Sequence, residues 1–245
     1  RSPRHLSLAY HGASLVIEWI EETHGFPAIV RMLREYGTGK GDAEVLQTVL
    51  GADPEQLDTA FHSWLRERYP DDAVRQYRDR LVEAQRLAQS GDLAAAEQQL
   101  VDAGDLFSEA DALLPTQLGR IRLERGDTAG VISAYSRAAA IDENAYGVNV
   151  TLAELAESQG NADLLIESLE RVMYIHPYDA AHHRRLADAY AQAGERDGVV
   201  RARRAVVALR PVDQAEALYQ LAVALRDAGD PGEARRQVMR ALELA

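Results

Sequence analysis

Two residue classes are scarce in this sequence: it has no cysteine, and aromatic residues make up only 6% of it. The absence of cysteine excludes disulfide scaffolds, thiolate zinc sites and cysteine nucleophiles. With few aromatic rings, the apolar core must come mainly from leucine, valine, isoleucine and alanine, which suits packed helices better than β-sandwiches. No apolar run reaches the roughly 18 residues that a membrane-spanning helix needs, so we expect no membrane insertion.

Lysine is almost missing as well. Lys40 is the only lysine among 27 basic residues, and the 39 acidic residues give the chain a net charge of −12. A chain this acidic is a poor general ligand for phosphate backbones, which argues against a nucleic-acid partner. The arginine bias is typical of GC-rich coding, so arginine abundance by itself carries little weight.

The sequence begins at Arg1 without a methionine and without the pattern of a signal peptide. We therefore expect a piece of a longer protein, and we expect a bacterial source. Disulfides would mark an oxidising compartment, so a chain without cysteine is compatible with either the cytoplasm or export.

Five glycines in the last two thirds of the chain recur at a nearly constant interval. Each follows a helical apolar pattern, precedes an acidic residue or asparagine, and is followed by a second helical pattern. Such a glycine can end a helix in the left-handed conformation without a Cβ penalty, and an Asp or Asn after it can cap the next helix. They are Gly91, Gly126, Gly160, Gly194 and Gly229, separated by 35, 34, 34 and 35 residues.

This frame predicts helix pairs that stack on one another. Apolar residues at three- and four-residue spacing give each helix one apolar face. A single pair is too small to bury that face, so neighbouring pairs must cover it. Small residues such as Ala96 and Ala103 would let the two antiparallel helices of a pair approach closely.

The pattern resembles the tetratricopeptide repeat over roughly residues 77–245. The early tryptophan of that family is missing, and Arg203 stands where an apolar residue is expected. The resemblance implies a right-handed α-solenoid that binds a protein or peptide. The best-matching residues are Leu118, Gly119, Gly126, Asp127, Tyr135 and Ala138 in one unit, and Leu186, Ala187, Tyr190, Gly194 and Pro211 in another.

We therefore expect an all-α protein with a small N-terminal helical bundle (residues 1–70) followed by an α-solenoid of about five helix pairs (residues 71–245). The predicted repeat units lie near 77–111, 112–145, 146–179, 180–214 and 215–245.

The first seventy residues lack the repeat frame and predict four helices. Asp53 should cap the fourth helix, Pro54 suits its first position, and Gln56 completes a capping box. The glycine-rich loop 37–41 is predicted to be a connector, because Lys40 is followed by glycine and no strand precedes it, unlike a phosphate-binding loop. The expected helices cover 6–23, 26–36, 42–50 and from Pro54 to near Tyr69.

The order of these helices resembles the C-terminal end of a gluzincin-type, peptidase MA-like metallopeptidase domain. In that group a tyrosine opens a helix of small and then apolar residues, and a helix with Leu, Phe and Trp comes last. The matching segments are 9–16, then Leu33, Tyr36 and Gly37, then Ala43, Leu46, Leu50 and Gly51, and finally Leu57, Phe61 and Trp64.

This resemblance implies a zinc enzyme whose metal ligands are missing from the sequence in hand. Gluzincins bind zinc through HExxH and a later glutamate, and no HExxH occurs here. We expect no metal, cofactor or catalysis from this chain alone, and zinc only in a longer parent protein. Tyr10 matches the family's tyrosine that stabilises the oxyanion, although a half-buried helical tyrosine would give the same pattern. The histidines are His5, His11, His24, His62, His176, His182 and His183.

In tetratricopeptide arrays the first helix of each unit lines the concave surface, which gives a predicted binding face. Its residues carry both signs of charge and would bind an extended peptide through charge-assisted hydrogen bonds. The lysines and asparagines with which some family members clamp a peptide carboxylate are absent. The predicted partner-binding residues are Gln117, Arg120, Glu154, Arg184, Asp188, Tyr219 and Arg226, with Glu124, Glu157 and Gln220 on the same face.

Two short segments, 182–185 and 201–204, concentrate basic residues in the fourth unit. They could form a basic patch, or simply a solvated face in an arginine-biased protein. No aromatic residues are interleaved with them, so single-stranded nucleic acid is a poor candidate. His182 and His183 should point about 100° apart on a helix, which is unsuited to sharing a metal.

Three functional hypotheses follow. The first is an interaction scaffold that binds a protein, a peptide or the parent protein's own upstream domain. The second is the C-terminal, non-metal-binding portion of a zinc metallopeptidase, whose repeats recruit substrate or pack on the catalytic domain. The third is self-association through exposed apolar helix faces, because the last unit stops at residues 242–245 without a polar capping helix.

Overall fold

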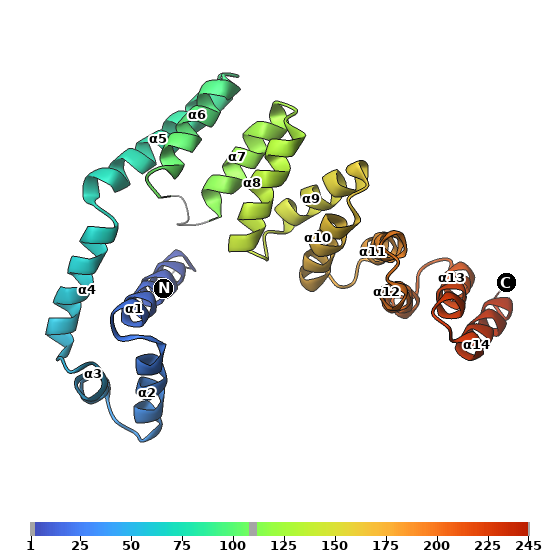
Figure 1. Ribbon diagram of the computed structural model, residues 1–245, viewed down its shortest axis with the longest axis horizontal. Helices are drawn as coiled ribbons and strands as arrows, with labels where there is room; N and C mark the ends of the chain where they lie inside the picture. Colours follow the sequence, from blue (N-terminus) through green and yellow to red (C-terminus); the bar gives the residue numbers. More distant parts are fainter. Residues whose placement is uncertain (1–2, 108–111, 245) are drawn as a thin grey trace. The chain divides into compact units, whose positions relative to one another are not determined.

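The computed structural model describes residues 3–107 and 112–244, with the side chains of residues 3–11 outside that description. The described residues form fourteen helices and no strand, which confirms the all-α prediction (Figure 1). Contacts divide the chain into residues 1–78 and 79–245. The division falls inside α5 (Asp71–Gln89), a continuous helix that begins directly after residue 70.

The first unit contains four helices in the order expected from the sequence. The third helix has the predicted bounds, and the others differ from them by a few residues at their ends. The helices are α1 (Pro3–His24), α2 (Phe26–Gly37), α3 (Asp42–Leu50) and α4 (Pro54–Arg68).

The start of α4 shows why local sequence predicts these boundaries well. The Asp53 side chain accepts a hydrogen bond from the Gln56 backbone N–H at 2.9 Å, and the Gln56 side chain accepts one from the Asp53 N–H at 3.1 Å. This is the predicted capping box, which satisfies two donors that a helix N-terminus otherwise leaves free.

The core of the first unit contains both tryptophans of the chain and one of its three phenylalanines. Trp19 of α1 lies 5.7 Å from Phe61 of α4, ring centre to ring centre, and Phe61 stacks on Trp64 at 5.9 Å. The Trp64 indole donates to Glu22 at 2.9 Å, which holds α4 against α1. The buried residues are Trp19, Ile20, Ala28, Met32, Val45 and Leu57.

The second unit is an array of antiparallel helix pairs. Its helices follow α5 as α6 (Leu93–Gly104), α7 (Leu113–Glu124), α8 (Thr128–Ile141), α9 (Tyr146–Gln159), α10 (Ala162–Ile175), α11 (Ala180–Ala193), α12 (Arg196–Ala208), α13 (Gln214–Asp227) and α14 (Pro231–Leu242). Within the described residues, none of the helices is both long and apolar enough to cross a membrane.

The five predicted turn glycines are confirmed as the ends of the first helix of each pair. Their φ angles are 85°, 75°, 67°, 76° and 89° in chain order, all in the left-handed region that glycine adopts without strain. The next residue then caps the second helix in four pairs: the side chains of Asp92, Asp127, Asn161 and Asp230 each accept a backbone N–H. Glu195 does not cap α12.

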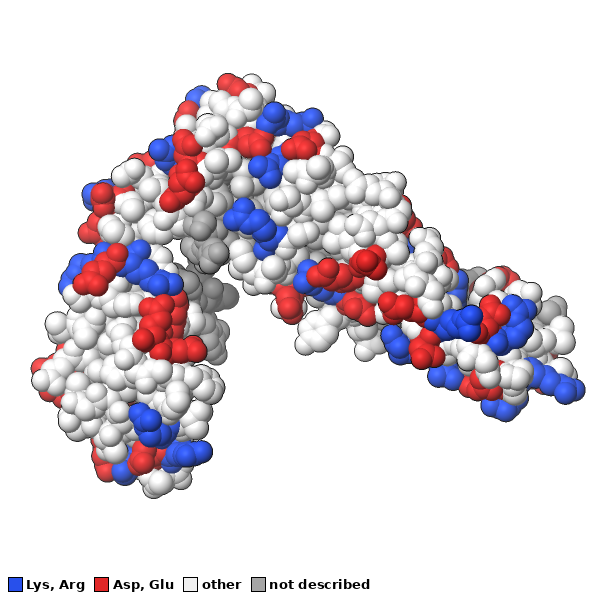
Figure 2. All heavy atoms as spheres, in the orientation of Figure 1, with Lys and Arg blue, Asp and Glu red and all other residues white. Residues whose placement is uncertain are grey.

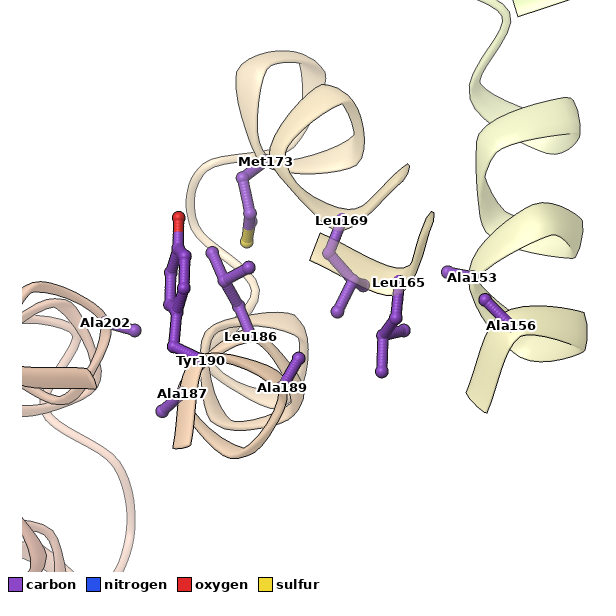
Figure 3. Packing of buried hydrophobic residues seen from close by; sticks show 10 residues of the cluster. All are labelled: Ala153, Ala156, Leu165, Leu169, Met173, Leu186, Ala187, Ala189, Tyr190 and Ala202. Atoms are coloured by element: carbon purple, nitrogen blue, oxygen red, sulfur yellow. The ribbon is translucent and has the colours of Figure 1, made fainter. Parts of the chain in front are cut away.

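Neighbouring pairs bury their apolar faces against each other, as the repeat requires. Figure 3 shows Leu165 and Leu169 of α10 beside Leu186 of α11, so the second helix of one pair packs on the first helix of the next. Ala96 and Ala103, predicted to permit close approach within the first pair, are completely buried.

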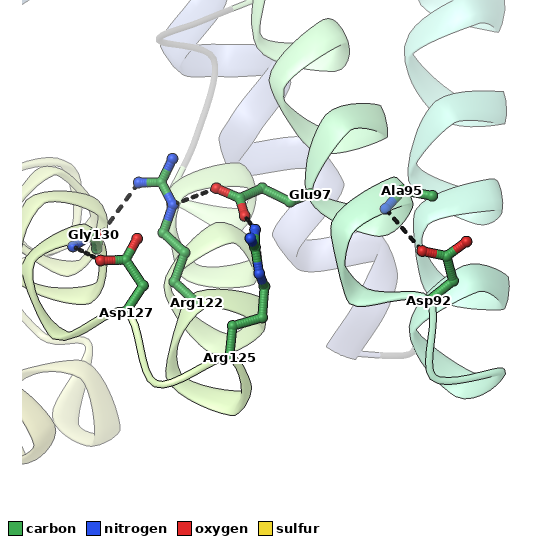
Figure 4. Close-up of polar contacts among 7 residues, drawn as sticks. All are labelled: Asp92, Ala95, Glu97, Arg122, Arg125, Asp127 and Gly130. Carbon is green, nitrogen blue, oxygen red and sulfur yellow. Dashed lines mark hydrogen bonds and ion pairs between the residues drawn. The ribbon is translucent and has the colours of Figure 1, made fainter.

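A buried ion network joins the first pair to the second. Arg122 of α7 donates through Nε to Glu97 of α6 at 2.8 Å and through Nη1 to the Gly130 carbonyl at 3.2 Å (Figure 4). Arg125 donates to the other Glu97 oxygen. Only 16% of the Glu97 side chain and 22% of the Arg122 side chain are exposed, so this carboxylate stabilises the contact between the two pairs.

Candidate interaction surface

The residues predicted to line the binding face all lie on the first helices of the second to fifth pairs. They are exposed, apart from a half-buried Gln117, so they are available to a partner. Gln117 and Arg120 lie on α7, Glu154 on α9, Arg184 and Asp188 on α11, and Tyr219 and Arg226 on α13.

The structure places Arg184 and Asp188 near a groove. Arg184 borders a pocket that lies beside α13. Asp188 accepts a hydrogen bond from Arg203 of α12. Tyr219 and Arg226 lie outside the groove lining, and Arg226 forms an ion pair with its neighbour Asp227. The predicted binding role stays a prediction for all seven residues.

The groove is formed by α11, α12 and α13. Its larger part has a volume of about 520 Å³ and combines apolar walls with charged residues. A second part of about 370 Å³ adjoins it, since Arg203 and Gln220 border both parts. The larger part is lined by Ala191, Gly194, Arg196, Val199, Arg203, Gln220, Val223, Ala224 and Asp227.

The prediction of the binding face included only Gln220 among the residues lining the larger part of the groove, and Arg203 is one of those that it missed. Its side chain is only 16% exposed, and its guanidinium forms an ion pair with Asp188. The sequence did contain a signal, because Arg203 occupies a position where the repeat has an apolar residue. From the sequence, however, the direction of its side chain and the neighbouring groove could not be read.

The two basic segments of the fourth pair do not form a continuous basic patch. Arg185 pairs with Glu157, and Arg204 pairs with Glu233. Arg201 lies over the ring of Tyr190, 5.6 Å from its centre, in a cation–π contact. Figure 2 accordingly shows red and blue side chains intermixed over α11 to α14. The mixture favours a partner with both charges over a polyanion.

A second exposed surface lies at the connection between α10 and α11. Tyr146 contacts His176 edge to face, with 4.6 Å between ring centres, and Tyr178 beside them is 84% exposed. These rings border a pocket of about 440 Å³. At the last helix, Met239, Leu242 and Leu244 are exposed, as the self-association hypothesis expected.

The metallopeptidase interpretation of the first unit is not tested by the structure. Tyr10 lies within α1, but its side chain falls outside the described residues. Among the described residues there is no group of three or more His, Asp or Glu side chains placed to hold a metal ion. His182 lies near Asp179, with 3.6 Å between nitrogen and oxygen, and His183 contacts the Pro177 carbonyl. Catalysis and zinc therefore stay predictions about a longer parent protein.

No protein-family model matches the sequence, and no curated protein matches it. Solved structures of MamA are similar in fold. The crystal structure of MamA protein is 17% identical, with 69% of this chain and 91% of that one covered and a TM-score of 0.44. MamA of Desulfovibrio magneticus is 19% identical, with 71% and 95% covered and a TM-score of 0.41. At these values we carry no function over from MamA.

The helix pairs, their period and their glycine turns support an α-solenoid of the tetratricopeptide type over the second unit. Nothing found here supports a gluzincin domain before it.

Proposed function

We propose that this protein is an interaction scaffold that binds an extended peptide segment of a partner protein in the groove of α11, α12 and α13. The observation that carries the proposal is the groove itself, which is about 520 Å³ in volume and includes Gln220 of the predicted binding face in its lining. Its walls mix aliphatic side chains with a few charged ones, as peptide and ligand sites commonly do.

The arrangement of the groove suits an extended chain. It runs between two first helices over the second helix that joins them, and its two parts follow one another past Arg203 and Gln220. Arginine and glutamine side chains can bind a peptide's carboxylates and backbone, while Val199 and Val223 offer apolar contact. We infer a partner segment of a few residues bound in extended form.

Filling the groove from an exposed position tests this proposal. Ala191 lines the groove and is exposed, so Ala191→Trp should occupy it without disturbing the core. Ala181 is also exposed on α11 but does not line the groove, so Ala181→Trp is the matched control. Peptides selected on the immobilised chain from a random phage-displayed library should lose affinity for the first variant and keep it for the second. Equal affinity for both variants would contradict the proposal.

A further inference from the structure

Arg203 occupies a position that belongs to the core in every other helix pair. Nine residues after the turn glycine, the other four pairs have Leu100, Tyr135, Leu169 and Val238. The first three of these are buried and Val238 is half-buried. In the fourth pair a charged guanidinium replaces this apolar side chain and borders an open groove. Burial of a charge is costly unless partners compensate it, so this position calls for a partner.

The partner that the chain itself supplies is weak. Within the part of the chain that the structure describes, Asp188 is the one acidic group paired with Arg203, through a single guanidinium nitrogen. The Asp188 side chain is 60% exposed, so solvent screens much of this attraction. Since a guanidinium has five N–H donors, the contact with Asp188 uses only a part of the hydrogen-bonding capacity of this groove-lining residue.

Arg122 is an arginine with a structural role, and its partners differ from those of Arg203. It donates both to Glu97, which is 16% exposed, and to the Gly130 carbonyl, and both acceptors come from packed neighbouring segments. The preceding helix pair supplies Glu97 and so completes the contacts of Arg122. Arg203 instead faces a groove where the following pair leaves room for another molecule.

The groove lining defines what would fit beside Arg203. Val199 of α12 and Val223 of α13 give the larger part of the groove apolar lining. Acidic residues border both parts of the groove, namely Asp227 in the larger part and Asp213 and Glu216 in the smaller one. Arg196 borders the larger part and Arg184 the smaller one, so the lining carries both signs of charge, and one carboxylate at Arg203 is matched in charge.

We propose that the groove recognises a single acidic residue of the partner peptide, with an aliphatic residue next to it. The carboxylate pairs with Arg203 in place of Asp188, and the aliphatic side chain lies against Val199 and Val223. The inference rests on the proposed function and adds the chemistry of the partner to it. Arg203 is then paired in both states: with Asp188 in the free protein and with the peptide carboxylate in the complex.

The first test removes the guanidinium. Peptides selected from the phage library on the full chain are synthesised with a fluorescent label, together with versions in which the acidic residue is replaced by its amide. Arg203→Leu restores the residue type found in other pairs and should fold. We expect about tenfold weaker binding of the acidic peptide to this variant, the size expected for a lost hydrogen bond to a charged group. The amide peptide should bind both proteins equally.

The second test predicts the opposite sign. Asp188→Asn removes the competing carboxylate, so the acidic peptide should bind several-fold more tightly, whereas damage to the fold would weaken binding. Asp197→Asn, an exposed change on α12 outside the groove lining, is the control and should leave affinity unchanged.

Different results would overturn the two claims, namely that the groove binds a peptide and that Arg203 recognises its acidic residue. Selected peptides that lose affinity for Ala191→Trp but lack an acidic residue, or that bind Arg203→Leu as well as the parent chain, would overturn the role of Arg203 and leave the groove in place. A library that yields no peptide sensitive to Ala191→Trp would overturn both.

Discussion

The second and fourth helix pairs contain the same two residue types in exchanged places. Four residues before the turn glycine, the second pair has Arg122 and the fourth has Tyr190; nine residues after it, the second pair has Tyr135 and the fourth has Arg203. Both tyrosines are buried in the interior of their pair. The exchange shows that either helix can supply the ring that fills a pair.

Each tyrosine needs a glycine on the facing helix. A Cβ atom added at Gly119 would lie 2.2 Å from the Tyr135 ring, and one added at Gly198 would lie 2.5 Å from the Tyr190 ring. Burial raises the pKa of both tyrosine hydroxyls, and the hydrogen bond to Glu170 adds to the rise at Tyr190. The rings are therefore integral to the packing and stay neutral at physiological pH.

The exchange also decides what the arginine does. At the earlier position, Arg122 contacts Glu97 of the preceding pair. At the later position, Arg203 borders the groove toward the following pair. One residue type can therefore stabilise a pair contact in one repeat and create a candidate binding site in another, depending on the helix that carries it.

A methyl group at either glycine should cause the largest loss of stability. We expect Gly119→Ala and Gly198→Ala each to lower the free energy of unfolding by about 2–3 kcal/mol, because the added Cβ atom overlaps a tyrosine ring in a packed interior. Urea unfolding followed by circular dichroism measures the loss.

Two controls make this prediction specific. At Gly147 in α9 an added Cβ meets nothing within 4 Å, so Gly147→Ala should be neutral or stabilise by up to about 1 kcal/mol. The third pair already combines Ala153 and Leu169 at the positions of Gly119 and Tyr135. Adding Tyr135→Leu to Gly119→Ala should therefore recover stability, and additive losses would contradict the proposed overlap.

Removing the acidic partner of each arginine compares how much Arg122 and Arg203 contribute to stability. Glu97→Ala leaves Arg122 and Arg125 without their shared carboxylate in a mostly buried contact, and we expect a loss of about 2 kcal/mol. Asp188→Ala removes a partner that is itself 60% exposed but leaves the largely buried Arg203 without it, so its cost should be smaller, about 1 kcal/mol. Equal losses in urea unfolding would show that Arg203 is as structural as Arg122.

Straining the left-handed turn, which all pairs share, should cause a smaller loss of stability. Gly160 has a φ of 67°, and an added Cβ would meet no neighbour within 4 Å. Gly160→Val should therefore cost roughly 1 kcal/mol or more through backbone strain alone. A thermal melt unchanged by this substitution would contradict the importance of the turn conformation.

Helix capping should show the smallest difference between the two pairs. Asp127 accepts the Gly130 N–H at 2.9 Å, so Asp127→Ala should cost about 1 kcal/mol. Glu195, at the same place in the fourth pair, caps nothing, and Glu195→Ala should change stability by less than about 0.5 kcal/mol. Thermal unfolding of the two variants side by side provides the measurement.

Features that depend on neighbouring residues in the chain were predicted to within a residue or a few. The capping box of Asp53 and Gln56 and the turn at Gly160 lie where the sequence placed them, because a cap or a left-handed turn involves only residues within one helical turn. The groove could not be predicted in this way. Asp188 and Arg203 belong to different helices, and their contact depends on how those helices pack.

The sequence by itself determined that this protein is all-α, and that its second part is built from helix pairs on a period of 34 or 35 residues. The spacing of apolar residues and the backbone freedom of glycine are local properties, and they determine where helices form and end. Only the tertiary structure decided which exposed side chains share a surface and where a groove opens. Those features depend on the space between α11 and α13, which the packing of α12 beneath them sets.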